Sequence, residues 1–154
     1  MKYWLFKSEA SCYSIDDLKE DKRTAWTGIR NYQARNFIKD EMKGGDPVLF
    51  YHSSSNEVGI YGTARVKTLA YPDITQFDEK GEYYDPKATR EKPRWFTVDI
   101  LFVSKFKYPV TLHEMRLYRD LVGLVVLEKG SRLSIQPVSK KHFDRIIELS
   151  KVKK

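Results

Sequence analysis

The sequence predicts a mixed α+β domain, built around a curved sheet or small β-barrel and flanked by short helices. Three observations support this fold class. Short segments rich in aromatic and β-branched residues recur along the chain and predict about five or six strands. The helical patterns between them are short and do not alternate strictly with the strands, which argues against a doubly wound sheet. The length of 154 residues matches one domain, so we expect a single domain over residues 1–154.

The first part of the chain predicts one strand and two helical segments. Residues 2–7 are short and aromatic-rich, which is typical of a strand. Ser14, followed by Asp17, forms an approximate capping box and predicts a short helix directly after it. Residues 24–30 have the composition of a loop, and residues 31–42 show moderate helical periodicity.

Residues 47–53 and 59–66 predict a β-hairpin with a polar loop between its strands. Pro47 cannot donate to a strand ladder, so we expect it at the start of its strand or on an edge. Gly59 and Gly62 weaken the second strand locally and indicate a bulge or a close approach of two backbones.

The second half of the chain begins with a long polar segment, residues 79–94, which we expect to form a functional loop or flap. Residues 95–106 give the best strand pattern in the chain. Residues 111–130 predict short helical turns, and residues 132–137 a short strand that ends at Pro137. Residues 140–152 predict the final helix, with one apolar side.

The formal net charge of +7 and the pI of about 9.4 predict a basic surface that attracts phosphate backbones. Cys12 is the one cysteine, so we expect no internal disulfide, and we interpret it as a small buried side chain. No apolar run approaches the roughly 20 residues of a membrane span, and no signal peptide is visible. We therefore expect no membrane partner and a cytoplasmic location.

The common enzyme motifs are missing from the sequence. It contains no GxGxxG, no phosphate-binding loop with Gly-Lys-Ser/Thr, no GxSxG and no HExxH. His52, His113 and His142 are far apart and lack the spacing of metal ligands. We therefore expect no catalysis, no metal and no cofactor.

What remains is a mixture of aromatic, amide and basic side chains in turn segments. Proteins that recognise unstacked bases use an aromatic wall, a few contacts to the base edge and a basic rim. Each residue alone has a simpler structural explanation, and Trp95 in particular fits a core position. The aromatic candidates are Trp26, Tyr32, Tyr51 and Trp95, the polar ones Asn31, Gln33, Ser53, Ser134 and Gln136, and the basic ones Arg30, Arg35, Arg65 and Arg132.

Six ordered blocks of this chain resemble those of the EVE domain family. They read KYWLFKSEASCYSIDDL, WTGIRNYQARNF, GDPVLFYHS, GIYGTARV, YYDPK and RLSIQPVS, and the resemblance covers roughly residues 2–149. It implies a PUA-like fold, similar to YTH domains, and a reader of modified bases in DNA or RNA. Two positions depart from the family pattern: Ala10 stands where Pro is common, and Pro47 where Leu is common.

The resemblance also implies a site. Trp26 would form a wall of the base pocket, and Arg30 and Arg35 would hold phosphates. Arg132 would close the far side of the pocket, and we predict that it too contacts phosphate. The remaining pocket residues implied are Lys7, Ser8, Asn31, Tyr32, His52, Ser53, Ser134 and Gln136.

The leading hypothesis is a non-catalytic, monomeric module that binds nucleic acid and holds one modified base in an aromatic pocket. Two alternatives remain open at this point. One is a nucleobase-directed enzyme with His52 as general base, and the other is a sensor of a free nucleoside or another small molecule. The sequence leaves open whether the polymer is DNA or RNA and which modification is bound.

Overall fold

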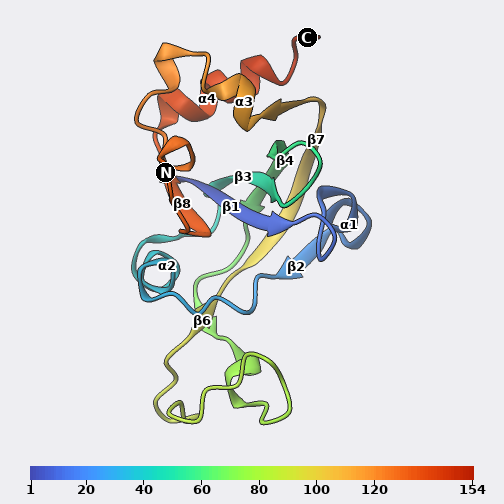
Figure 1. Cartoon of the computed structure of the whole chain (residues 1–154). Helices are drawn as coiled ribbons and strands as arrows, with labels where there is room; N and C mark the ends of the chain where they lie inside the picture. The colour runs from blue at the N-terminus through green and yellow to red at the C-terminus, as the bar shows by residue number, and fades with distance from the viewer.

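A six-stranded mixed sheet, strongly curled into a half barrel, forms the centre of the computed structural model, which describes residues 1–154 (Figure 1). The strand order is β2-β7-β4-β3-β1-β8, and β1 and β3 form the one parallel pair. A separate two-stranded sheet pairs β5 with β6. The strands are β1 (Tyr3–Glu9), β2 (Arg23–Ala25), β3 (Pro47–Ser53), β4 (Gly59–Val66), β5 (Tyr71–Pro72), β6 (Phe96–Thr97), β7 (Asp99–Thr111) and β8 (Ile135–Val138). This architecture confirms the predicted fold class.

Short helices cover both faces of the sheet. In Figure 1, α3 and α4 lie at one end of the molecule and α1 and α2 beside the sheet. No helix has the length and apolar character needed to cross a bilayer. The helices are α1 (Ile15–Asp21), α2 (Tyr32–Asn36), the π-helical η1 (Phe37–Glu41), α3 (Leu112–Met115) and α4 (Lys140–Leu149), with 3-10 turns η2 (Ile74–Phe77), η3 (Arg119–Leu121) and η4 (Val125–Leu127).

The central strands are buried on both faces, which explains their continuous apolar sequences. Successive side chains of a strand point to opposite faces. Trp4 and Phe6 of β1 therefore join a core cluster with α1 and α2, whereas Leu5 joins a second cluster with α3 and α4. On β3, Phe50 and Leu49 divide between the same two clusters.

The predicted capping box at the start of α1 is confirmed. The Ser14 hydroxyl accepts a hydrogen bond from the Asp17 backbone N–H at 3.2 Å, and the Asp17 carboxylate accepts one from the Ser14 N–H at 2.9 Å. Both bonds satisfy N–H groups that a helix start leaves without partners.

The predicted close approach at the glycines of β4 is also confirmed. A Cβ on Gly62 would lie 2.4 Å from the Ser104 carbonyl oxygen, and one on Gly59 would lie 2.5 Å from that of Val110. The register with β7 shifts between Ile60 and Gly62. These glycines let β4 and β7 bend together, which curls the sheet.

Several element boundaries differ from the sequence prediction. Arg23–Ala25 form β2, although Thr24 and Ala25 were expected in a loop, because these residues pair with β7 at the sheet edge. The strong strand pattern after Trp95 breaks at Val98 and continues to Thr111. The helix expected over 31–42 divides into α2 and η1. Strand β8 continues past Pro137 to Val138, because an edge strand tolerates proline.

Candidate nucleic-acid interface

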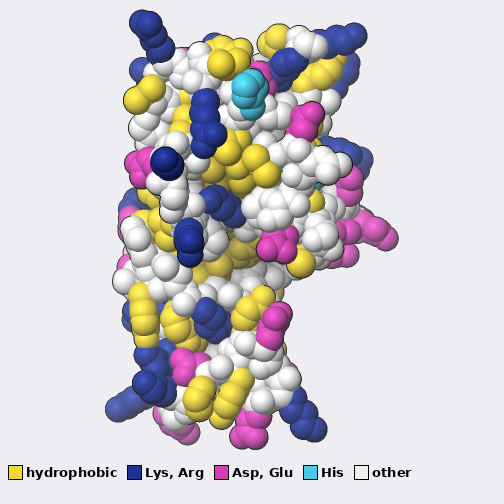
Figure 2. All heavy atoms as spheres, in the orientation of Figure 1, with side chains coloured by type: hydrophobic (Ala, Val, Ile, Leu, Met, Phe, Trp, Pro, Cys, Tyr) yellow, Lys and Arg dark blue, Asp and Glu magenta, His cyan; other side chains and the backbone are white.

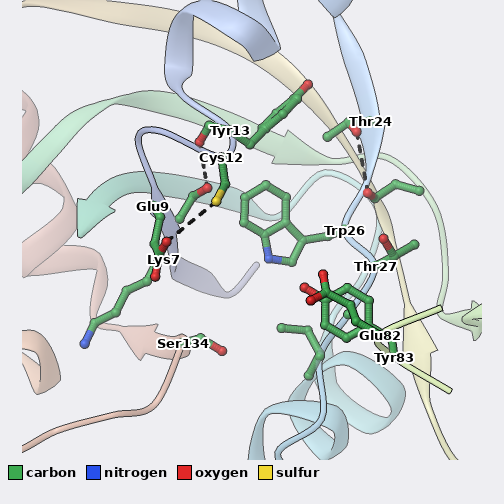
Figure 3. Close-up of a pocket in the computed structure, with 14 residues that line it drawn as sticks. Lys7, Glu9, Cys12, Tyr13, Thr24, Trp26, Thr27, Glu82, Tyr83 and Ser134 are labelled. Carbon is green, nitrogen blue, oxygen red and sulfur yellow. Dashed lines mark hydrogen bonds between the residues drawn. The ribbon is translucent and has the colours of Figure 1, made fainter. Parts of the chain in front are cut away.

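A hollow of about 630 Å³ lies where the end of β1 faces the residues after β2. We call it the Trp26 pocket. Figure 3 shows the Trp26 indole in the middle of its lining residues. The volume falls within the roughly 300–1,000 Å³ of ligand pockets. The lining residues are Lys7, Ser8, Glu9, Cys12, Tyr13, Thr24, Ala25, Trp26, Thr27, Gly28, Ile29, Glu82, Tyr83 and Ser134.

The inner wall of the pocket is Trp26, which rests on aromatic side chains of the core. Its ring centroid lies 5.4 Å from that of Phe6 and 5.6 Å from that of Phe50, and Tyr13 meets it edge-on at 6.3 Å. The Trp26 backbone N–H donates to the Val98 carbonyl oxygen at 3.0 Å. The side chain is half-buried, so packing fixes the indole while part of it stays open to the pocket.

The outer wall is Tyr83, which comes from the long 79–94 loop. Its ring packs directly on the backbone of Gly28, where a Cβ would lie 2.7 Å from the tyrosine Cζ. Gly28 has φ +90°, a conformation that glycine adopts without steric cost. Burial raises the pKa of the Tyr83 hydroxyl, so this group stays protonated and can donate a hydrogen bond. Sequence reasoning missed Tyr83, although it belongs to the YYDPK block.

Arg30 holds the outer wall in place. Its guanidinium donates twice to the Tyr83 carbonyl oxygen, at 2.8 and 3.1 Å, and once each to the Ile29 carbonyl oxygen, the Asp73 carboxylate and the Thr75 hydroxyl. These bonds use all five N–H donors of an arginine. The predicted phosphate contact of Arg30 is therefore not what this structure supports, because no donor is left for a phosphate.

Asp73 anchors this arrangement from inside the protein. Its fully buried carboxylate accepts hydrogen bonds from the Gly28 N–H at 2.8 Å, from Thr75 and from Arg30. Burial alone would raise the pKa of Asp73, but the bonds from Thr75, Gly28 and Arg30 outweigh it and hold that pKa below its usual range. The ionised carboxylate thus joins the residues after β2 to the segment that carries Tyr83.

Gln76 fixes the two ends of the 79–94 loop. Its side-chain amide donates to the carbonyl oxygens of Asp73 at 2.7 Å and Trp95 at 2.9 Å. Its carbonyl oxygen accepts from the N–H groups of Arg94 and Trp95 at 2.9 and 3.0 Å. The fully buried side chain therefore has a partner at every position, and the loop closes on a fixed base.

Charged groups surround the opening of the pocket. Lys7 donates from Nζ to the Ser131 carbonyl oxygen at 3.3 Å, and burial lowers the pKa of its ammonium group. Glu9 and Glu82 contribute exposed carboxylates to the lining. The interpretation of Cys12 as a buried side chain is wrong: Cys12 is exposed in the turn after β1, and its Sγ lies 3.6 Å from the Glu9 carboxylate.

The structure separates the predicted site residues into three groups. Asn31 and Arg132 line a neighbouring hollow, which is described below. Six of the predicted residues lie outside both hollows. Arg30 is one of them, because its side chain is held in the hydrogen-bond network described above. Those that line the Trp26 pocket are Lys7, Ser8, Trp26 and Ser134, and those outside both hollows are Tyr32, His52, Ser53, Gln136, Arg30 and Arg35.

His52 is occupied within the fold. Its Nε2 accepts a hydrogen bond from the Ile15 backbone N–H at 3.0 Å, and its ring stacks on Tyr61 at 4.2 Å. Burial lowers the pKa of His52, which keeps the ring neutral and the Nε2 lone pair available to Ile15. That lone pair is the one a general base would need, so the structure gives no support to an enzyme with His52 as its base.

Three further predicted residues have packing partners instead of a place in the pocket. Tyr32 is 48% exposed and stacks on the buried Trp95 at 4.9 Å, with the Arg35 guanidinium over its ring at 4.8 Å. Gln136 is fully buried and donates to the Leu133 carbonyl oxygen. Ser53, at the end of β3, pairs with the end of β1. No group of His, Cys, Asp or Glu side chains is placed to hold a metal ion.

The curled mixed sheet, the short helices and the pocket beside its edge define a protein of the predicted PUA-like class. The sequence comparison then gives the family: the EVE domain profile matches residues 2–149, and the chain belongs to the EVE domain family. Human thymocyte nuclear protein 1 is 38% identical to this chain over an alignment 165 residues long. The alignment covers 96% of this chain and 73% of the relative.

Solved structures agree with this assignment. The human THYN1 protein in complex with 5-methylcytosine containing DNA has a TM-score of 0.92 and 37% identity, with 100% of both chains covered. A Pseudomonas syringae protein has a TM-score of 0.91 and 44% identity and covers 96% of this chain and 99% of its own. An ASCH protein from Zymomonas mobilis, with a TM-score of 0.54 and 9% identity over 97% of this chain and 99% of its own, is alike in fold alone.

Proposed function

We propose that this protein binds DNA and holds one modified cytosine base, taken out of the base stack, against Trp26. The observation that carries the proposal is the half-buried indole of Trp26, fixed by Phe6 and Phe50 and open to a hollow of about 630 Å³. The complex of human THYN1 with 5-methylcytosine containing DNA supports the choice of polymer and base. Binding takes place without turnover.

The two walls have different roles in this proposal. Trp26 supplies a flat surface for stacking, which contributes about 1–3 kcal/mol per base. Tyr83 limits the pocket on the outer side. Extruding the base costs a few kcal/mol, so stacking and the contacts of the flanking strand together have to exceed that cost.

The charged rim suits a cytosine edge. The exocyclic amino group of cytosine is a donor that Glu and Asp side chains accept from. Glu9 and Glu82 bring two carboxylates to the lining. Thymine and uracil offer no amino group, so this rim favours cytosine over them.

The test is a binding titration with matched oligonucleotides, single- and double-stranded, that are unmodified or carry 5-methylcytosine. Wild-type protein should bind the methylated strand at least tenfold more tightly. Trp26→Ala should weaken that binding by about 1–3 kcal/mol, the contribution of base–aromatic stacking. Trp26→Phe, which keeps an aromatic ring on the Phe6 and Phe50 support, should recover part of the loss.

Two outcomes would contradict the proposal. If Trp26→Ala folds normally and binds as wild type does, the base is not held at Trp26. If free 5-methyldeoxycytidine competes as well as the oligonucleotide, and salt has no effect, the protein is a nucleoside sensor. RNA strands with the same modification, included as a third set, decide between the two polymers.

A further inference from the structure

A second hollow of about 570 Å³ lies next to the Trp26 pocket, between the start of α2 and the turn that precedes β8. We call it the Arg132 groove. We propose that this groove binds the backbone of the nucleic-acid strand beside the extruded base, an inference that rests on the proposed function. Its lining includes Asn31, Gln33, Phe37, Glu128, Lys129 and Arg132.

Two chain segments contribute residues to both hollows. One chain segment lines the Trp26 pocket up to Ile29 and the groove from Asn31 onward. The other lines the groove up to Leu133 and the pocket at Ser134. One residue separates the hollows along the first segment and none along the second, so a strand that places its base in the pocket has its neighbouring phosphates at the groove.

Lys7 links the hollows directly. Lys7 lines the Trp26 pocket, and its Nζ donates to the carbonyl oxygen of Ser131, a residue that lines the groove. Figure 2 shows Lys and Arg side chains on this face from the level of β8 down to the level of β6. Acidic side chains gather at the right of the same view, over α1.

The charges of the groove fit a polyanion. Lys129 and Arg132 are exposed, and neither takes part in any of the nine ion pairs of the protein. A single carboxylate, that of Glu128, faces these two cations in the lining. Unpaired cations at the surface attract phosphates and release condensed counterions when they bind them.

The amide groups of the groove supply neutral donors. The Asn31 side-chain oxygen accepts from the Ala34 N–H at 3.0 Å to cap α2, which leaves its amino group free to donate. Gln33, two residues onward, is exposed in the same lining. Such side chains donate to phosphate and sugar oxygens and fix the position of a strand without selecting its sequence.

The experiment measures the salt dependence of binding for Lys129→Ala/Arg132→Ala. The slope of log K against log salt should become shallower by about 1.4 with single strands and about 1.8 with duplex, because each phosphate contact contributes about 0.7 or 0.9. The preference for the methylated strand should stay as in wild type. Both side chains are exposed, so thermal unfolding should not change.

The matched control is Lys151→Ala/Lys153→Ala, which removes the same charge from exposed positions after α4. If the two double variants change the slope equally, only net charge matters and the groove proposal is overturned. The slope is also measured on unmodified strands. If wild-type protein shows no preference for methylated strands but the groove variant still loses slope, the proposed function fails and the groove stands.

Discussion

The two walls of the Trp26 pocket are held by different kinds of interaction. The inner wall, Trp26, rests on Phe6 and Phe50 through ring contacts at 5.4 and 5.6 Å. The outer wall, Tyr83, is held through Arg30 and Asp73, with hydrogen bonds of 2.8 to 3.2 Å. Ring packing is non-directional and tolerates small shifts, whereas a buried charged network has one satisfied geometry.

Because of this difference, substitutions in the inner wall and in the outer wall are expected to affect different properties of the protein. The inner wall belongs to the core that the sheet provides, so a change of its exposed face acts mainly on the ligand. The outer wall lies on a segment with little core of its own, and its position depends on a buried carboxylate. A change in that network should first lower stability and then, through Tyr83, alter the pocket.

The largest effect is expected from Asp73→Asn. Removing one partner of a buried ion pair typically costs about 3–5 kcal/mol, because the other charge loses its compensation. Arg30 is 21% exposed and Asp73 fully buried, which favours the lower end of that range. Urea unfolding monitored by tryptophan fluorescence measures the change.

The control for Asp73→Asn is Glu79→Gln, which removes the same charge at an exposed position of the neighbouring loop. It should change the free energy of unfolding by less than about 0.5 kcal/mol. Equal effects of the two substitutions would show that Asp73 does not hold the outer wall.

A smaller effect on the free energy of unfolding is expected from Gly28→Ala, for which Gly45→Ala is the matched control. Both glycines have positive φ, +90° and +96°, so alanine should cost roughly 1–2 kcal/mol of backbone strain at each. A Cβ on Gly45 meets nothing within 4 Å, whereas one on Gly28 meets the Tyr83 ring at 2.7 Å. Gly28→Ala should therefore be the less stable variant and should also weaken oligonucleotide binding. Identical stability and binding of the two variants would mean that Tyr83 is free to move aside.

The smallest expected effect is a pH dependence of the free energy of unfolding. It comes from His52, whose ring centroid lies 5.6 Å from that of Phe50 behind the inner wall. Burial lowers the pKa of His52, against a smaller opposing influence of Asp16, and Lys105 and Asp17 also face it. Below pH 6.5, the usual pKa of histidine, the unfolded chain binds a proton that the folded protein resists. The free energy of unfolding should therefore fall as the pH drops from 6.5 to the lower folded pKa.

The measurement is a series of urea titrations between pH 5 and pH 8, for wild type and for His52→Gln. The glutamine oxygen can accept from the Ile15 N–H in place of Nε2 but does not titrate, so this part of the pH dependence should disappear. A variant that keeps the full slope would assign the effect to other groups.

Much of the fold was predictable because its signals are local. The capping box at Ser14 and the start of β3 at Pro47 depend on residues a few positions apart. Gly59 and Gly62 indicated a bulge or a close approach of two backbones without knowledge of the partner strand. Strand β2 was missed because its three residues become a strand only through pairing with β7.

The candidate site was predictable only in part. Trp26 stood out within a mixture of aromatic, amide and basic side chains, and the resemblance to the EVE domain family implied its place in a pocket wall; the structure places it in the lining of a pocket. The role of Arg30 depends on Asp73, 43 positions away, and that of Tyr83 on its contact with Gly28. Those pairings need the fold, because no local pattern predicts which carboxylate an arginine meets. That Trp26 holds a base stays a prediction.

The closure of the 79–94 loop by Gln76 has a consequence for protein engineering. Gln76 ties the Asp73 end of this segment to Trp95, so the two ends stay together whatever lies between them. Residues 86–92 are mostly exposed and lie outside both hollows. An insertion there, such as a peptide tag or a dye attachment sequence, would lie in a loop whose two ends are fixed by hydrogen bonds. The loop is thus a natural position for a reporter that lies outside the Trp26 pocket.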